Sequence, residues 1–127
     1  MLQLRRRRLW IATSLVLLAA VLFASLQPGF GPTVPANFDK VEHLVAYTLL
    51  AVWFTGLVAR GRYWVVACAL LALGLLIEAL QGLMDVGRSA EVPDMLANAL
   101  GVVVGITIAL LSTGGWAPRF EAWLGWK

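Results

Sequence analysis

Residues 63–84 read YWVVACALLALGLLIEALQGLM, and this stretch decides the fold class. Its only charged side chain is that of Glu78. A helix needs about 20 apolar residues to cross a hydrocarbon core of about 30 Å. Residues 63–84 therefore predict a membrane-spanning helix, and the carboxylate within it needs a partner or a function.

The composition of the whole chain agrees with a membrane protein. Of the 127 residues, 61% are hydrophobic and 13% are charged, and the mean hydropathy is +0.83. Soluble domains average about 45–50% apolar and about 25% charged residues. A soluble domain of this size has too little interior to bury so much apolar surface. Disordered, collagenous and disulfide-rich classes are excluded too, because the 12 glycines have no period and Cys68 has no partner in the chain.

Three further stretches have the length and polarity of membrane spans. They cover residues 9–26, 38–59 and 93–115, and residues 116–127 form an aromatic tail with one amphipathic helical face. We therefore predict an all-α polytopic membrane protein. It has four transmembrane helices, a short C-terminal interfacial helix and a single domain over residues 1–127.

Basic residues beside the spans predict the orientation. Eight lie on one side of the expected bundle, in the groups Arg5 to Arg8, Arg60 with Arg62, and Arg119 with Lys127. Only Lys40 and Arg88 lie on the other side. Because Lys and Arg concentrate on the cytoplasmic side, both termini are expected in the cytoplasm, with the chain in the cytoplasmic membrane. This distribution also explains the net charge of +3 without nucleic-acid binding.

Each of the last three spans carries a stripe of polar or small residues on one helical face. Residues four apart in a helix differ by only about 40° around the axis, so they share a face. The stripes are Asp39, His43 and Tyr47; Gly74, Glu78 and Gln81; and Asp94, Asn98, Gly101 and Gly105.

The three stripes are expected at the same depth in the membrane. At 1.5 Å per residue, His43 lies about 6 Å inside Asp39, and Asn98 about 6 Å inside Asp94. Glu78 lies about 22 Å from the inner end of its span, or about 7 Å below the outer boundary. We therefore predict one outward-facing polar pocket in the outer third of the membrane, with Arg88 beside it as a bidentate group for phosphate or carboxylate.

Purely structural roles are open for several of these residues. Asp39 and Asp94 are placed to cap helix N-termini. Asn98 could join helices by a hydrogen bond, with Gly101 and Gly105 as a close helix contact. His43 could be a packing residue, and Tyr47 an interfacial aromatic residue. For Glu78 a functional role is favoured, because an uncompensated carboxylate in a membrane is costly.

Three sequence blocks resemble the signatures of VanZ-like membrane proteins. Residues 39–47, DKVEHLVAY, resemble the family's DK-x-x-H-x-x-x-Y pattern, and residues 78–81, EALQ, resemble its E-x-x-Q. Residues 88–101, RSAEVPDMLANALG, resemble its R-S…D-x-x-x-N-x-x-G, although Pro93 is a less usual residue there. The blocks occur in the family's order, and their combination is specific.

The resemblance implies a small bacterial membrane protein of the cell envelope. The family's named member is associated with resistance to the glycopeptide teicoplanin, but membership in so broad a family does not imply resistance here. The family pattern marks these ligand-binding candidates: Asp39, Lys40, His43, Tyr47, Glu78, Gln81, Arg88, Ser89, Asp94 and Asn98.

Three functions compete for these residues. The first is recognition of a polar or anionic lipid or lipid-linked envelope component from the outer leaflet. The second is an intramembrane enzyme with His43 and Glu78 as acid and base and Arg88 on an oxyanion. The third is a proton- or ion-coupled transporter component. We rank recognition first and leave open whether the chain is an enzyme, because no catalytic motif is present.

The sequence also sets expectations for cofactors and partners. It contains no P-loop, no dinucleotide-binding fingerprint and no paired metal-ligand spacing, so neither a cofactor nor a metal is expected. Membrane lipids are the expected partners, nucleic acid is not, and assembly into a homo-oligomer is left open.

Overall fold

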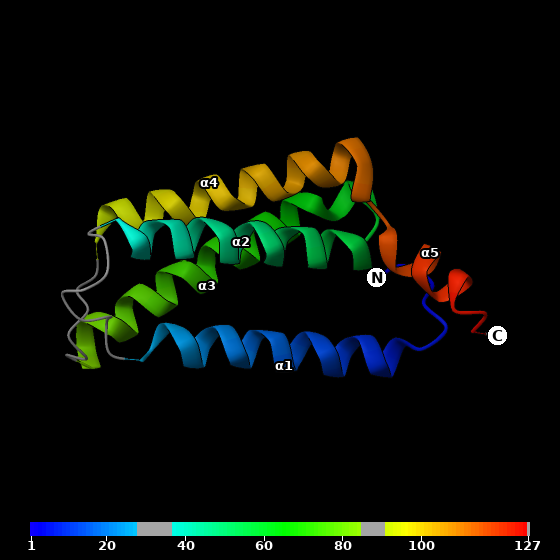
Figure 1. Ribbon diagram of the computed structural model, residues 1–127, viewed down its shortest axis with the longest axis horizontal. Coiled ribbons are helices and arrows are strands. Elements are labelled where there is room, and N and C mark those ends of the chain that lie inside the picture. Colours follow the sequence, from blue (N-terminus) through cyan, green and yellow to red (C-terminus); the bar gives the residue numbers. More distant parts are fainter. Residues whose placement is uncertain (28–36, 85–90, 127) are drawn as a thin grey trace.

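The computed structural model describes residues 1–27, 37–84 and 91–126, and these contain helices but no strand. Four long helices lie side by side, with both termini at the end of the bundle that carries the last, short helix (Figure 1). In chain order the elements are α1 (Arg7–Ser25), α2 (Phe38–Leu57), η1 (Arg60–Arg62), α3 (Tyr63–Met84), α4 (Val92–Ile108), η2 (Ala109–Thr113) and α5 (Trp116–Trp123).

Three stretches of the described chain are long and apolar enough to cross a membrane. They are Arg7–Ser25, Arg60–Met84 and Val92–Thr113. The expected all-helical class is confirmed for the described residues, and the three apolar stretches fit the expected membrane protein. α2, the second of the four expected spans, is a helix of 20 residues but does not meet this standard. Its first turns carry Asp39, Lys40 and Glu42, which lower its hydropathy.

The distribution of side chains fits a lipid environment. Large apolar side chains face outward on every long helix, such as Leu15 on α1, Leu49 on α2, Leu83 on α3 and Leu100 on α4. Polar side chains including Gln81 and Asn98 are buried. A soluble bundle would show the opposite arrangement, because water favours polar side chains on the surface.

α2 and α4 pack closely because two glycines of α4 face the α2 backbone. A Cβ atom on Gly101 would lie 2.6 Å from the carbonyl oxygen of Leu44. A Cβ atom on Gly105 would lie 2.6 Å from the carbonyl oxygen of Thr48 and 2.5 Å from the Cβ of Ala51. The structure thus confirms that these glycines form a helix contact of the small-residue kind.

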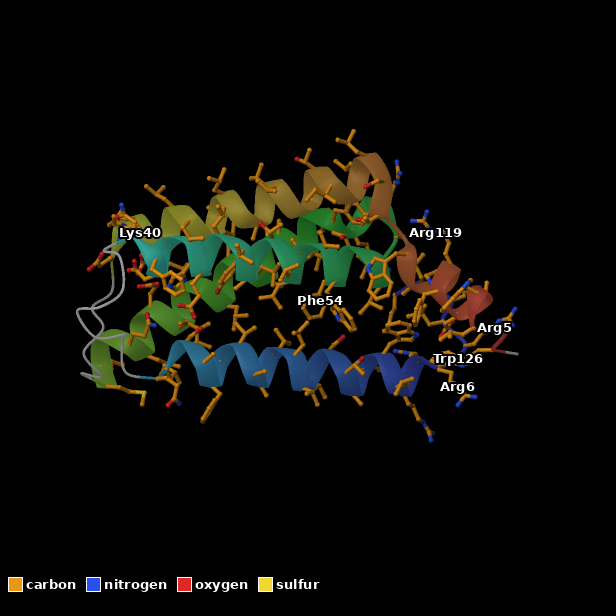
Figure 2. All side chains as sticks on the ribbon, viewed as in Figure 1. Arg5, Arg6, Lys40, Phe54, Arg119 and Trp126 are labelled. Carbon is orange, nitrogen blue, oxygen red and sulfur yellow. The ribbon has the colours of Figure 1, made fainter. Side chains whose placement is uncertain are left out.

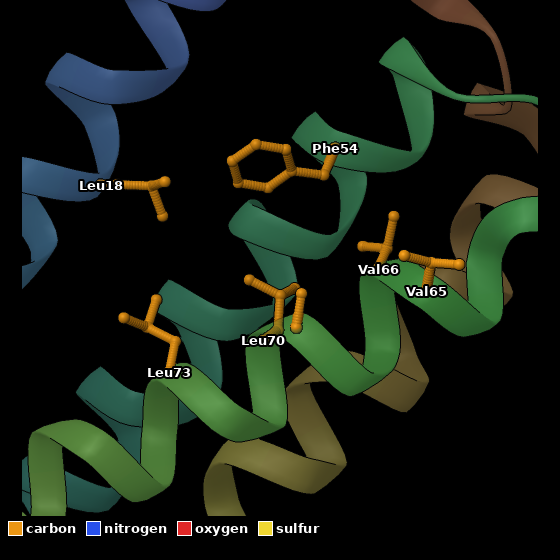
Figure 3. Close-up of a pocket in the computed structure, with 7 residues that line it drawn as sticks. Leu18, Phe54, Val65, Val66, Leu70 and Leu73 are labelled. Atoms are coloured by element: carbon orange, nitrogen blue, oxygen red, sulfur yellow. The ribbon is translucent and has the colours of Figure 1, made fainter. Parts of the chain in front are cut away.

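α1 is joined to the rest of the bundle by polar contacts near both ends and by apolar contacts of Leu17, Leu18 and Val21 between them. At its C-terminal end, the Gln81 side chain donates a hydrogen bond of 2.7 Å to the Ser25 carbonyl. Between the ends lies an apolar groove of about 350 Å³ (Figure 3), where Leu18 of α1 faces Phe54 of α2 and Leu70 and Leu73 of α3.

The N-terminal end of α1 is held by a carboxylate from α5. Glu121 is buried and accepts hydrogen bonds from the backbone N–H groups of Arg5 (2.8 Å) and Arg6 (2.9 Å) and from the Trp10 indole (2.7 Å). Figure 2 shows Arg5, Arg6 and Trp126 together at this end of the bundle, with Lys40 at the opposite end. Glu121 therefore anchors the segment just before α1 from a distant part of the sequence, and its charge lies near the positive end of the helix dipole.

The aromatic tail is the short helix α5, as expected, but its aromatic residues divide between two environments. Trp116 packs against Trp10 and Trp53, with ring centroids 5.3 Å apart in both pairs. Trp123 is 78% exposed and Phe120 41% exposed. The helix therefore docks on the bundle through Trp116 and one edge of Phe120, whose ring centroid is 6.3 Å from that of Trp10. Trp123 is left on the outer side, where an interfacial aromatic residue would lie.

Lowering the pH is expected to loosen α5 from α1. Burial raises the pKa of Glu121, but the hydrogen bonds from Arg6, Arg5 and Trp10 and the Arg5 charge outweigh it, so that the pKa lies below the ordinary 4.5. A carboxyl with a lowered folded-state pKa stabilises above its unfolded pKa and loses that contribution as the pH falls through the folded value.

Thermal unfolding in detergent, followed by tryptophan emission, should therefore show lower stability below about pH 4.5 than at pH 7. The Glu121→Gln variant should be less stable than wild type at pH 7 and should lose less on acidification. An equal acid loss in both proteins would contradict this role for Glu121.

Candidate functional site

A cluster of buried polar side chains lies where α2 and α4 begin and α3 ends, at the end of the bundle opposite the termini (Figures 1 and 2). α2 contributes His43 and Tyr47, α3 contributes Glu78, and α4 contributes Asp94 and Asn98. All five are buried. The structure thus brings together members of the three polar stripes that the sequence places at one depth.

His43 lies between two residues of α4. Its Nδ1 is 2.8 Å from Oδ1 of Asn98, and its Nε2 is 3.8 Å from Oδ2 of Asp94. Because a carbonyl oxygen can only accept, Nδ1 carries the proton and donates to Asn98. In the neutral ring, Nε2 then directs its lone pair toward Asp94. Asn98 therefore joins α2 and α4 by a hydrogen bond, and it also orients the imidazole.

Glu78 and Asp94 each have an oxygen that no hydrogen bond satisfies among the described residues. Oε2 of Glu78 accepts the backbone N–H of Glu91 at 3.2 Å, whereas Oε1 has no partner. Oδ1 of Asp94 likewise has none. Burying an unsatisfied polar atom costs about 1–3 kcal/mol, and more for a charge. Such atoms indicate a place where a ligand, ion or water completes the structure.

Tyr47 adds a third unsatisfied oxygen to the cluster. Its side chain is 2% exposed, and its hydroxyl has no hydrogen-bond partner in the described chain. The hydroxyl and the Asn98 amide lie over Gly74 of α3, where a Cβ atom would be 3.2 Å from the Tyr47 oxygen and 2.9 Å from Nδ2 of Asn98. Gly74 is one helical turn from Glu78, so Tyr47 lies against the same face of α3.

Lys40 is engaged with carboxylates at the rim of the cluster. Its Nζ is 3.6 Å from Asp39, 3.7 Å from Glu91 and 3.9 Å from Asp94. Its charge therefore offsets acidic neighbours. Asp94 lies in the first turn of α4, and its Oδ1 has no hydrogen-bond partner among the described residues.

Of the other expected site residues in this part of the chain, the structure describes Gln81 but not Arg88 or Ser89. Gln81 is turned toward α1, where it bonds to Ser25, and its role in the structure is to join two helices. Arg88 and Ser89 lie outside the described residues.

A small cavity of about 70 Å³ adjoins the cluster between α1 and α2, lined in part by Ser25, His43 and Tyr47.

The structure adds Glu91 and Glu42 to the surroundings of the cluster. Glu91 contacts both Glu78 and Lys40, and Glu42 lines the small cavity beside His43. Glu91 is the N-cap residue of α4 and Asp94 is the third residue of that helix, so Glu91 lies near the cluster because it stands at the start of α4. Glu42 shares no stripe with His43, and only the packing of α1 reveals its position.

The family assignment rests on most of the chain. The model of the VanZ/LLP1 family matches residues 3–113. This range includes every residue of the buried polar cluster. The chain belongs to this family. No curated protein and no solved structure matches the chain.

Proposed function

We propose that this protein recognises a polar or anionic lipid headgroup, or the headgroup of a lipid-linked envelope component, from the outer leaflet of a bacterial inner membrane. It does so as a single VanZ-like domain over residues 1–127, with four spanning helices and both termini in the cytoplasm. The observation that carries the proposal is the buried polar cluster of His43, Glu78, Asp94 and Asn98 at one end of a bundle whose outer surface is apolar.

The chemistry of the cluster supports a headgroup that both donates hydrogen bonds and carries negative charge. The free oxygens of Glu78, Asp94 and Tyr47 can accept from hydroxyl or amine groups. Lys40 is already balanced by acidic residues, so the cation for a phosphate would be Arg88, whose guanidinium binds phosphate in a bidentate manner. Apolar surface beside the cluster accommodates the lipid chains.

Lipid binding by the purified protein tests the proposal. Phosphatidylglycerol carries a phosphate and two hydroxyls, whereas phosphatidylcholine with the same chains has no hydrogen-bond donor. Native mass spectrometry should show preferential retention of phosphatidylglycerol. The preference should fall in Asn98→Leu and persist in Arg119→Ala, a basic residue at the opposite end of the bundle (Figure 2). Equal retention of both lipids by wild type would contradict the proposal.

An intramembrane acid/base enzyme is the second candidate, and the contact of His43 with Asp94 favours it. A carboxylate 3.8 Å from an imidazole can stabilise the protonated ring during proton transfer. Glu78, with one free oxygen, would be the second acid or base. This candidate requires that wild type converts a lipid-linked substrate to a product, which a binding protein would not do.

The orientation can be tested with reporter fusions. The termini, the Arg60–Arg62 turn and α5 lie at one end of the bundle, and this arrangement supports the orientation derived from the basic residues (Figure 1). Reporters inserted after Gln27 and after Gly87 are expected outside the cytoplasm, and a reporter after Arg62 inside. A cytoplasmic signal at Gln27 or Gly87 would contradict the orientation and would place the polar cluster in the inner leaflet.

A further inference from the structure

The polar cluster contains a set of metal-ligand atoms that no sequence motif indicates. One nitrogen of His43 and one oxygen each of Glu78 and Asp94 all lie within 4.8 Å of one another, and all three residues are buried. They come from α2, α3 and α4, so their spacing along the chain matches no local metal motif. We propose that these three residues bind a divalent transition-metal ion, of which Zn²⁺ is the representative.

The unsatisfied oxygens point to a bound cation. Glu78 Oε1, Asp94 Oδ1 and Tyr47 Oη are all without a hydrogen bond among the described residues. Lys40 is 3.9 Å from Asp94, beyond hydrogen-bond distance. Two neighbouring buried carboxylates repel each other, and either a proton on one of them or a cation between them relieves the repulsion. A metal ion is such a cation and occupies the free lone pairs.

The orientation of His43 is that of a metal ligand. Its Nδ1–H donates to Asn98 at 2.8 Å, which fixes the tautomer that leaves a lone pair on Nε2. That lone pair faces an oxygen of Asp94 at 3.8 Å, and two acceptors cannot bond to each other. Zn²⁺ lies about 2.0–2.2 Å from imidazole nitrogen and carboxylate oxygen, so two of its ligand atoms lie up to about 4 Å apart. The observed separation therefore suits an ion between them.

The ligand set also indicates which class of ion fits. Imidazole nitrogen favours transition metals such as Zn²⁺, whereas Mg²⁺ and Ca²⁺ prefer sites made only of oxygen. Three protein ligands leave a fourth position open, which suits an exogenous oxygen. If the proposed function holds, that oxygen belongs to the headgroup phosphate, and this role rests on the proposed function. The ion site itself does not depend on it.

Metal titration of the purified full chain tests the site directly. After treatment with a chelator and its removal, wild type should bind one Zn²⁺ per chain by calorimetry. Co²⁺ at the same site should give the visible absorption of a low-coordinate ion. Glu78→Gln and Asp94→Asn should each weaken binding about 100-fold or more, because each removes a charged ligand. Asn98→Ala should weaken it about 10- to 100-fold through the loss of imidazole orientation.

Glu42→Gln is the matched control, because it removes a carboxylate next to His43 that is not in the ligand set. It should bind Zn²⁺ as wild type does. Since a variant could fail to fold, wild type provides a second readout: Zn²⁺ should raise its melting temperature, and Mg²⁺ should not. Absence of Zn²⁺ binding by folded wild type would overturn the inference, as would wild-type affinity in folded Glu78→Gln and Asp94→Asn.

Lipid binding separates this inference from the proposed function. If Zn²⁺ binds and a chelator abolishes the preference for phosphatidylglycerol, the ion site and its role at the headgroup are both supported. If Zn²⁺ binds but the chelator leaves that preference unchanged, the site stands and the role at the headgroup is wrong. If wild type shows the lipid preference but binds no Zn²⁺, the ion site is overturned and the proposed function is supported.

Discussion

Substituting Gly105 by leucine is expected to separate α2 from α4 and to produce the largest loss of stability of any single change considered. A Cβ atom there would lie 2.6 Å from the Thr48 carbonyl oxygen, and backbone cannot rotate aside as a side chain can. Overpacking a tight contact costs about 1–3 kcal/mol, and leucine adds three further carbons to the Cβ. Gly105→Ala should fall within that range, and Gly105→Leu beyond it.

Unfolding in detergent, followed by circular dichroism, measures this effect. Gly61→Ala is the control, because a Cβ atom at Gly61 would meet nothing within 4 Å. Moving α2 away from α4 should also break the hydrogen bond of His43 to Asn98, because this bond joins the two helices. Lipid preference should therefore fall together with stability. Wild-type stability in Gly105→Leu would contradict the close packing of α2 on α4.

Replacing Arg88 by alanine is expected to reduce phosphatidylglycerol binding about 10- to 100-fold. A hydrogen bond to a charged group contributes about 1.5–3 kcal/mol, and 1.4 kcal/mol is a factor of ten in affinity. Arg88→Lys should also be costly, because an ammonium cannot bind two phosphate oxygens in the planar geometry of a guanidinium. The measurement is the native mass spectrometry of lipid binding, with Arg119→Ala as the control.

The glutamine variants of His43 and Glu78 distinguish the enzyme from the binding protein. An acid/base enzyme should lose about 10²- to 10⁴-fold in turnover from either change. A binding protein has no turnover to lose, and its headgroup preference should depend on Arg88. Inactive Gln variants together with normal binding and function of Arg88→Ala would contradict the proposed function and favour the enzyme.

Features that depend on local sequence were predictable. The third span was expected at residues 63–84 and is observed as Tyr63–Met84. The apolar run after Arg62 is interrupted only by Glu78 and Gln81, and its length defines a helix by itself. The common depth of His43, Glu78 and Asn98 followed from rise per residue and span length, and these residues do lie together. For the last span, the regular helix ends at Ile108, and a wider turn, η2, continues to Thr113.

Features that depend on packing between distant segments were not predictable. Nothing in residues 116–127 shows that Glu121 binds backbone N–H groups more than 110 positions away, because backbone donors carry no sequence signal. Lys40 looked like a free cation for an anionic ligand, yet three carboxylates surround it. Two of these, Glu91 and Asp94, come from a region about 50 residues later, so their approach depends on how α4 packs beside α2.

The attachment of α1 at its two ends has a mechanical consequence. Hydrogen bonds join the N-terminal end of α1 to Glu121 and its C-terminal end to Gln81, and the apolar groove runs along part of the helix between them. Its 19 residues span about 28 Å at 1.5 Å per residue. A tilt of about 10° about the contact with Glu121 would displace the C-terminal end by about 5 Å, enough to break the hydrogen bond from Gln81 to Ser25. That end includes Ser25, which lines the cavity beside His43, so the hydrogen bond from Gln81 holds one wall of this cavity in place.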